Sequence, residues 1–374
     1  MSFNPSRQPR LSTRAFGALV CALLITLTTL GQERLSSAPP QLTWSAQTSG
    51  TLARLSSVFF TDREHGWIVG SNSTVLVTGD GGNTWRRVPL PHHELLRDVF
   101  FLDPQRGFAL GEYSIFNRLD NLSPKERAFL LASDDGGANW RAVSLAPQAV
   151  KADDPKRYNG DGLLRLLFVD DRAGWACGEA GLILVTRDGG RMWQLQRSPV
   201  TKLFYDLAAI DDKQAWIVGG GGAVLRTVDG GQQWNEQSSG TSQALRAVHF
   251  VDGRRGWAVG AGGTILATNN GGNRWRAQTS GTEENLNAVV FTSATEGWAA
   301  GDHATLLHTR DGGATWEQVA LKTRVNLARL FFIAPDCGWV VGVNGAIFKY
   351  QPGDPTRPAL SNQPSDEWKV ESKK

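Results

Sequence analysis

The chain repeats itself with a period of 41 residues, and this period constrains its fold more than any other feature. A Gly-Trp dipeptide, or a close variant of it, occurs seven times and opens a short apolar run that ends in Gly. The aromatic residues of the seven copies are Trp67, Phe108, Trp175, Trp216, Trp257, Trp298 and Trp339. Successive copies are 41 residues apart, except for Phe108 and Trp175, which are 67 apart. This regularity indicates repeated supersecondary units rather than several unrelated domains.

A second signature follows six of these dipeptides. It has the form Ser/Thr-x-Asp-Gly-Gly-x-x-Trp, which is known as the Asp-box or bacterial neuraminidase repeat. The residues at its Asp position are Asp80, Asp135, Asp188, Asp229, Asn270 and Asp311. An Asp side chain can accept N–H groups of its own turn, and Gly supplies the positive φ that a tight turn needs. We therefore predict a structural role for these residues and no catalytic one.

The fifth repeat shows how one unit is built. Apolar and β-branched residues predict strands A to D at 245–251, 256–259, 264–268 and 275–279, with Gly-rich turns between them. Four short strands in about 40 residues are typical of a propeller blade. Seven such units predict an all-β chain that folds as a seven-bladed β-propeller over residues 39–352.

The seventh repeat ends at Tyr350 without an Asp-box and without a strand D. The missing strand is present at the other end of the propeller, because residues 44–51 closely match residues 275–282, which form strand D and its linker in the fifth repeat. We therefore expect the N-terminal strand to complete the last blade. This pairing would close the ring and remove an exposed sheet edge.

The two ends of the chain differ from the repeats. Arg7, Arg10 and Arg14 precede a nearly uncharged apolar run at 15–30. This order is typical of a secretory signal, although the run is short for a membrane span of about 20 residues. We predict that residues 1–38 are a signal peptide or membrane anchor, which places the body on the periplasmic or thylakoid-lumen side. The polar, Pro-containing residues 353–374 predict a disordered tail.

Charge and cysteine content narrow the function classes. The formal net charge of +3 is carried by residues 1–38, with four Arg and one Glu, so the body is neutral. A nucleic-acid-binding protein would usually have a basic body. Cys21, Cys177 and Cys337 lie in separate segments and form no disulfide framework, and no Cys/His spacing resembles a zinc site. We expect Cys177 and Cys337 to be small buried side chains, and we expect no metal or cofactor.

Two insertions mark one face of the predicted ring. The extra residues of the second repeat lie in its B–C connection, within 113–128, and in the D–A connection that follows, within 145–162. Both connections belong to the same face, whereas the A–B and Asp-box turns of the opposite face keep a nearly constant length. Loops on a rigid scaffold commonly carry binding functions, so this face is the candidate interaction surface. Neutral variation of loop length is the alternative explanation.

The same face carries the first residues of the inner strands. The polar residues expected at equivalent places there are Arg97, Arg165, Arg246, Arg329, Tyr205, Asp206 and Asn287. Arginines from four blades around one opening would form a positive rim that could bind carboxylates with paired hydrogen bonds. In the alternative, Glu112, Glu179 and Asp302 of the B–C loops pair with these arginines.

The Asp-box spacing, the Gly-Trp-x-Val-Gly strands and the Trp-x-x-Gln-x-Ser-Gly-Thr linkers together resemble the photosystem II stability/assembly factor family. The resemblance covers roughly residues 40–350. It implies a non-enzymatic protein that is exported to the lumenal side, acts at a membrane during assembly of photosystem II, and uses a basic surface of arginines. We therefore expect a monomer that binds a protein partner, a membrane protein or an assembly intermediate.

Two other functions remain open from the sequence. Sialidases also carry Asp-boxes, but they need an arginine triad, a Tyr/Glu pair and an acidic Asp. Tyr205, Asp206 and Glu179 form the single assembly of this kind that the sequence offers, and seven blades and the absence of a Phe-Arg-Ile-Pro start argue against this class. A carbohydrate-binding propeller would explain the abundance of Trp, although the repeated positions of these residues favour a role in the core.

Overall fold

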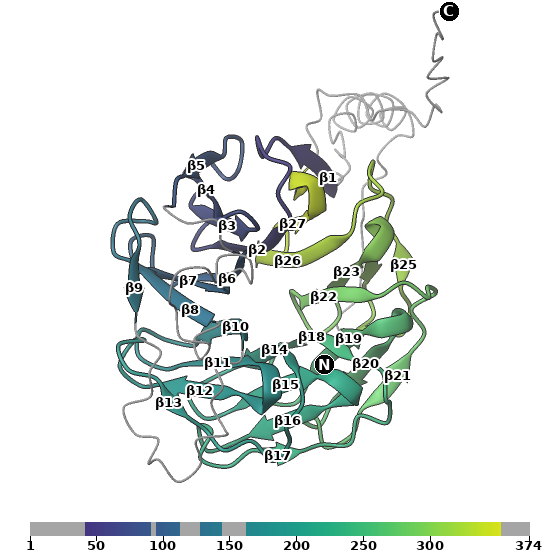
Figure 1. Cartoon of the computed structure of the whole chain (residues 1–374). Helices are drawn as coiled ribbons and strands as arrows, with labels where there is room; N and C mark the ends of the chain where they lie inside the picture. The colour runs from purple at the N-terminus through teal and green to yellow at the C-terminus, as the bar shows by residue number, and fades with distance from the viewer. Residues whose placement is uncertain (1–41, 91–94, 113–127, 144–161, 353–374) are drawn as a thin grey trace, which may run out of the picture. The chain divides into compact units, whose positions relative to one another are not determined.

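Seven four-stranded antiparallel sheets are arranged in a ring in the computed structural model, which describes residues 42–90, 95–112, 128–143 and 162–352 (Figure 1). The predicted seven-bladed β-propeller is therefore confirmed. The two terminal segments, 1–38 and 353–374, lie outside the described residues, as do the insertions of blade 2 at 113–127 and 144–161.

The blades follow one another along the chain, and the strands of each blade run in order from the inner strand A to the outer strand D. Blades 1 to 3 contain β2 (Leu55–Phe60), β3 (Gly66–Gly70), β4 (Thr74–Thr78) and β5 (Arg86–Val88); β6 (Leu95–Phe101), β7 (Gly107–Glu112), β8 (Ala128–Ser133) and β9 (Arg141–Val143); and β10 (Leu163–Phe168), β11 (Gly174–Gly178), β12 (Ile183–Thr186) and β13 (Gln194–Leu195). Blades 4 to 6 contain β14 (Phe204–Ala209), β15 (Ala215–Gly219), β16 (Val224–Thr227) and β17 (Asn235–Glu236); β18 (Leu245–Phe250), β19 (Gly256–Gly260), β20 (Ile265–Thr268) and β21 (Arg276–Gln278); and β22 (Leu286–Phe291), β23 (Gly297–Gly301), β24 (Leu306–Thr309) and β25 (Glu317–Gln318). The four strands predicted for repeat five are confirmed to within one residue at each end.

Blade 7 combines the two ends of the propeller. It contains β26 (Leu327–Ala334), β27 (Cys337–Gly342), β28 (Ile347–Pro352) and, as its outer strand, β1 (Leu42–Gln47). Figure 1 shows the purple β1 beside the yellow strands from the end of the chain. Trp44 of β1 packs against Tyr350 of β28 with ring centroids 5.1 Å apart, and the hydroxyl of Ser45 donates to the carbonyl of Lys349. The predicted closure by the N-terminal strand is confirmed.

Short 3₁₀ turns link strands B and C in five blades. They are η2 (Glu179–Gly181), η3 (Gly220–Gly222), η4 (Ala261–Gly263), η5 (Asp302–Ala304) and η6 (Val343–Gly345). Each lies against the D–A linker that leads into the next blade, as when the N–H of Gly263 donates to the carbonyl of Glu284. The Asp-box turns lie against the A–B turns instead, as when the N–H of Gly81 donates to the carbonyl of Glu64. The ring thus has an Asp-box face and an opposite face, which we call the mouth face.

The hydrophobic core lies between the blades. Each of the seven clusters of buried side chains contains residues from two consecutive blades, and one of them joins blade 7 to blade 1. The free thiols of Cys177 and Cys337 are buried in two different clusters. A ring of this kind is held together by its interblade contacts, so every blade depends on both of its neighbours.

A stacked aromatic pair recurs at these interfaces and explains the Gly-Trp dipeptide. Trp257 of blade 5 lies flat on Phe291 of blade 6, with centroids 3.5 Å apart, and its indole N–H donates to the carbonyl of Gly312 in the Asp-box of blade 6. The other side of the Phe291 ring covers Gly297, where a Cβ would lie 2.5 Å from the ring. Each Trp therefore needs Phe on the next blade, and each Phe needs Gly on its own blade.

Blade 4 departs from this pattern in a compensated way. Its inner strand ends in Ala209 instead of Phe, and the residue opposite, at the Gly position, is Ala215. Trp175 of blade 3 thus lacks the Phe on which the other Trp residues stack, and the guanidinium of Arg187 lies over its ring instead, 5.4 Å from the centroid. The two exchanges belong together, because the smaller Ala209 leaves room for the extra methyl group.

The Asp-box residues make local contacts. In the first box the hydroxyl of Thr78 donates to Asp80 and accepts the N–H of Gly82, and Asp80 also accepts the N–H of Thr84. The side-chain oxygen of Asn270 accepts the equivalent pair of hydrogen bonds in the fifth box, from Thr268 and from the N–H of Arg274. An amide oxygen can therefore replace the carboxylate in this turn.

Substitution of Gly256 by Ala tests the interlocked packing of the blades. The new Cβ would lie 2.5 Å from the ring of Phe250, so we expect the free energy of unfolding to fall by about 1–3 kcal/mol, measured by urea denaturation. The double variant Phe250→Ala/Gly256→Ala recreates the pair of blade 4 and should lose less than the sum of the single losses. Ala215→Gly is the control, because it introduces no clash. Additive losses in the double variant would contradict this account.

Replacement of Asp311 by Asn tests the contribution of a box carboxylate to acid stability. Hydrogen bonds from Thr315 and Thr309 lower the pKa of Asp311 to about 2, below its ordinary value of 3.8. The unfolded chain therefore binds more protons in this range, so the stabilisation is complete above about pH 4 and is lost as the pH falls towards 2. Asp311→Asn should reduce the loss of the urea midpoint between pH 5 and pH 2.5, and Asn270→Asp should increase it. Equal losses in the three proteins would refute the prediction.

Candidate partner-binding site

A one-residue irregularity at the start of every inner strand determines which side chains reach the mouth. In β18, Leu245 pairs with Gly260 and Ala247 pairs with Val259, so Arg246 is an extra residue in the ladder. Irregularities of this type redirect side chains. The extra residues, which we call the mouth layer, are Ser56, Arg97, Leu164, Tyr205, Arg246, Asn287 and Ala328.

The next residue of each strand forms a second layer, one step further from the mouth face. This inner layer consists of Ser57, Asp98, Arg165, Asp206, Ala247, Ala288 and Arg329. The predicted equivalence of the four arginines is therefore wrong. Arg97 and Arg246 belong to the mouth layer, whereas Arg165 and Arg329 belong to the inner layer. A shift of one residue between blades leaves no mark in the hydrophobic pattern, which both layers interrupt.

The inner layer is an ion-pair network near the ring axis. Arg165 lies between Asp98, at 2.5 Å, and Asp206, at 2.7 Å, and Arg329 reaches Asp206 from blade 7 at 3.4 Å. The carboxylates are nearly inaccessible, with side-chain exposures of 2% and 3%. Two arginines and two aspartates carry no net charge together, so Arg165 and Arg329 add little to a positive rim.

Backbone groups hold the two aspartates in place. Asp98 accepts the N–H of Leu166 and the hydroxyl of Ser57, and Asp206 accepts the N–H of Val248. Burial raises the pKa of Asp206 to about 6 although Arg165 acts in the opposite direction, so the carboxylate is charged at neutral pH. Asp98 was not among the residues predicted from the sequence. Its position directly after Arg97, at the start of an inner strand, was the available signal.

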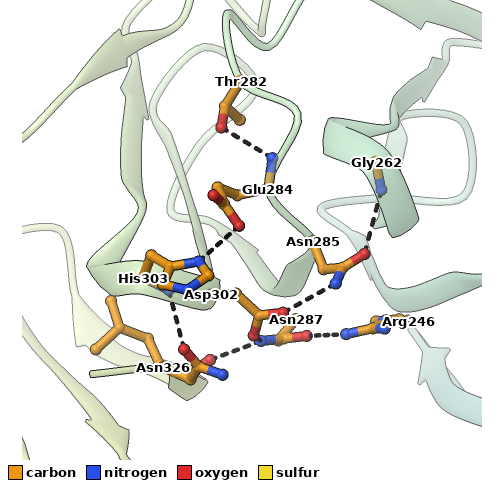
Figure 2. A network of polar contacts seen from close by, with 10 residues as sticks. Arg246, Gly262, Thr282, Glu284, Asn285, Asn287, Asp302, His303 and Asn326 are labelled. Atoms are coloured by element: carbon orange, nitrogen blue, oxygen red, sulfur yellow. Dashed lines mark hydrogen bonds and ion pairs between the residues drawn. The ribbon is translucent and has the colours of Figure 1, made fainter. Parts of the chain in front are cut away.

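The two mouth-layer arginines have different partners. Arg97 donates from Nε and Nη2 to Glu112, at 3.2 and 2.6 Å, so its charge is compensated. Arg246 donates from Nη1 to the side-chain oxygen of Asn287 at 2.6 Å (Figure 2). Within the described residues, Arg246 is the one member of the four whose side-chain partner is neutral.

The acidic residues of the B–C side follow the expected pairing only in part. Glu112 binds an arginine, as described, whereas Asp302 accepts amide N–H groups from Asn285 and Asn287, both at 2.9 Å. Glu179 accepts the N–H of Gly162. Tyr205 is half-buried in the mouth layer beside Asp206, whose two oxygens are occupied by arginines and by a backbone N–H.

The family model described as "Photosynthesis system II assembly factor YCF48" matches residues 37–152 and 238–325, more than half of the sequence. The chain belongs to this family. Among curated proteins, it is 29% identical over 154 residues to the photosystem II assembly lipoprotein Ycf48 of Synechococcus sp. (strain CC9902). It is 31% identical over 113 residues to the chloroplastic photosystem II stability/assembly factor HCF136 of Arabidopsis thaliana. The matches cover 40% and 29% of this chain, and they span only 39% and 23% of the length of the two relatives.

Solved structures agree over most of the Ycf48-family propeller. The structure titled "YCF48 bound to D1 peptide" superposes with a TM-score of 0.66 at 25% identity, and the match covers 84% of this chain and 97% of that one. YCF48 from Cyanidioschyzon merolae gives a TM-score of 0.64 at 22% identity, over 83% and 99% of the two chains, which supports the fold alone. The part of the chain that the structure describes contains no helix long and apolar enough to cross a membrane.

Replacement of Arg165 by Met tests the structural role of the inner layer. Two buried carboxylates would then lose their shared cation, and we expect the free energy of unfolding to fall by about 3–5 kcal/mol. Arg97→Met is the control, because its partly exposed ion pair should contribute only about 0–1 kcal/mol. The triple variant Arg165→Met/Asp98→Asn/Asp206→Asn should regain part of the loss. Equal losses for Arg165→Met and Arg97→Met in urea denaturation would contradict the assignment.

Proposed function

We propose that this chain is an exported, non-catalytic assembly factor that acts as a single ring and binds an extended acidic segment of a photosystem II membrane protein at its mouth face. Membership of the Ycf48 family supports the setting, and the relative whose structure contains a D1 peptide supports a peptide as the ligand. The observation that carries the proposal is the neutral partner of Arg246.

The chemistry of Arg246 favours a carboxylate ligand. A guanidinium has five N–H donors, and the hydrogen bond to Asn287 uses one of them. The remaining donors retain the fork geometry that binds a carboxylate with two parallel hydrogen bonds. Arg97 would first have to release Glu112, so we expect it to contribute less, and Tyr205 would add a polar contact from the same layer.

The remaining sequence-predicted residues have different roles in this proposal. Arg165 and Arg329 stabilise the ring and do not contact the ligand directly. Asn287 orients Arg246. The oxygens of Asp206 are held by Arg165, Arg329 and the N–H of Val248, an arrangement that suits a structural carboxylate better than a catalytic one. Export rests on the N-terminal sequence, which lies outside the described residues.

Binding of fluorescein-labelled peptides tests the proposal. The probes are a D1 peptide, an Asp/Glu-rich peptide of about twelve residues and its amide-matched form, in which every carboxylate is replaced by an amide. Charge-assisted hydrogen bonds suggest that Arg246→Ala will weaken binding of the acidic probe by about tenfold to a hundredfold. Arg97→Ala should have a smaller effect.

Arg276→Ala provides the matched control, because it removes the same charge from the exposed outer strand of the same blade. It should leave the affinity unchanged within about twofold at physiological salt, where charges further apart than a Debye length are screened. Equal binding of the acidic and amide-matched probes, or no loss with Arg246→Ala, would overturn the proposal.

A further inference from the structure

A chain of side-chain hydrogen bonds runs from the B–C turn of blade 6 to Arg246 of blade 5. Asp302, the first residue of η5, accepts an N–H from Asn287, and the oxygen of Asn287 accepts from Arg246 (Figure 2). The three residues come from two neighbouring blades and two different layers of the sequence pattern. No pair of them is close in sequence except Asn287 and Asp302, which are 15 residues apart.

The orientation of the Asn287 amide has a single solution. Its nitrogen lies 2.9 Å from an oxygen of Asp302 and 2.9 Å from the carbonyl of Leu327, and both of these atoms can only accept. The amide oxygen must therefore face Arg246, which can only donate. Asp302 is itself fixed by a second amide, Asn285, whose oxygen accepts the N–H of Gly262. The acceptor for Arg246 is thus held rigidly.

The two mouth-layer arginines are held by different chemistry. Glu112 contacts Arg97 directly, which fixes the guanidinium but also cancels its charge. In blade 5 the B–C turn is Ala261–Gly263 and offers no acidic side chain. The acid comes from the next blade and acts through a neutral amide, which fixes the guanidinium of Arg246 and leaves its charge available. An arginine that is ordered in advance loses less conformational entropy when a ligand binds.

We infer that Asp302 is a positioning residue for the mouth: acting through Asn287, it holds Arg246 in the orientation that binds a carboxylate. This inference rests on the proposed function. It predicts a sign that simple electrostatics does not, because removing the negative charge of Asp302 from the vicinity should, on charge alone, strengthen binding of an acidic peptide. The positioning role predicts weaker binding.

A double-mutant cycle between Asp302 and Arg246 tests the inference with the acidic twelve-residue probe. Asp302→Ala should weaken binding about threefold to tenfold in the wild-type background, as expected when a side chain must be ordered on binding. In the Arg246→Ala background the same substitution should change the affinity less than about twofold, because the residue through which it acts is absent. Asp302→Asn keeps an acceptor oxygen and should restore binding to within about twofold of wild type. Glu317→Ala, which removes one negative charge from the outer strand of the same blade, is the control for charge.

Asn287→Asp separates position from charge at the same site. It should keep Arg246 in place but compensate its charge, as Glu112 does for Arg97, and so reduce binding of the acidic probe about as much as Arg246→Ala. Stronger or unchanged binding with Asp302→Ala, or equal effects in both backgrounds, would overturn the inference while the proposed function stands. If Arg246→Ala itself has no effect, the proposed function fails and the inference fails with it.

Discussion

The stacking of a strand-B Trp on the Phe of the next blade is the contact on which the ring depends. It contributes dispersion and an aromatic pairing worth about 0.5–1.5 kcal/mol beyond simple burial, and it recurs at Trp67–Phe101, Trp216–Phe250, Trp257–Phe291 and Trp339–Phe60. Three of these Trp residues also donate to the Asp-box of the following blade. One residue therefore ties two blades together by packing and by a hydrogen bond, and the Asp-box provides the acceptor.

Most of the fold could be predicted because its determinants are local and repeated. The Gly-Trp and Asp-box signatures specify two strand ends and a turn in every blade, and the duplicated strand D at residues 44–51 announced the closure. Even the exception in blade 4 follows the rule, since Ala209 and Ala215 change together. The physical reason is that each signature residue makes the same contact in each copy, so the sequence displays the contact several times.

The site could be predicted only in outline. The sequence identified the face and the arginines, but not which arginine keeps an uncompensated charge. That property depends on pairs such as Arg165–Asp98 and Arg329–Asp206, whose members are 67 and 123 residues apart and occur once each. It also depends on the one-residue shift between Arg165 and Arg246, which the backbone ladder reveals and the hydrophobic pattern does not. Contacts that are unique and distant leave no periodic signal.

The pairing of β1 with β28 has a mechanical consequence. Trp44, near the start of β1, lies against Tyr350, near the end of β28, so the propeller begins and ends at one place on blade 7, where the other blades have an Asp-box turn. Every other blade is covalently continuous from strand A to strand D. Tension applied between the two ends would therefore load this seam first and peel its hydrogen bonds one after another, while the six remaining blades carried almost none of the force. The resistance of the whole ring to pulling is set by one pair of strands.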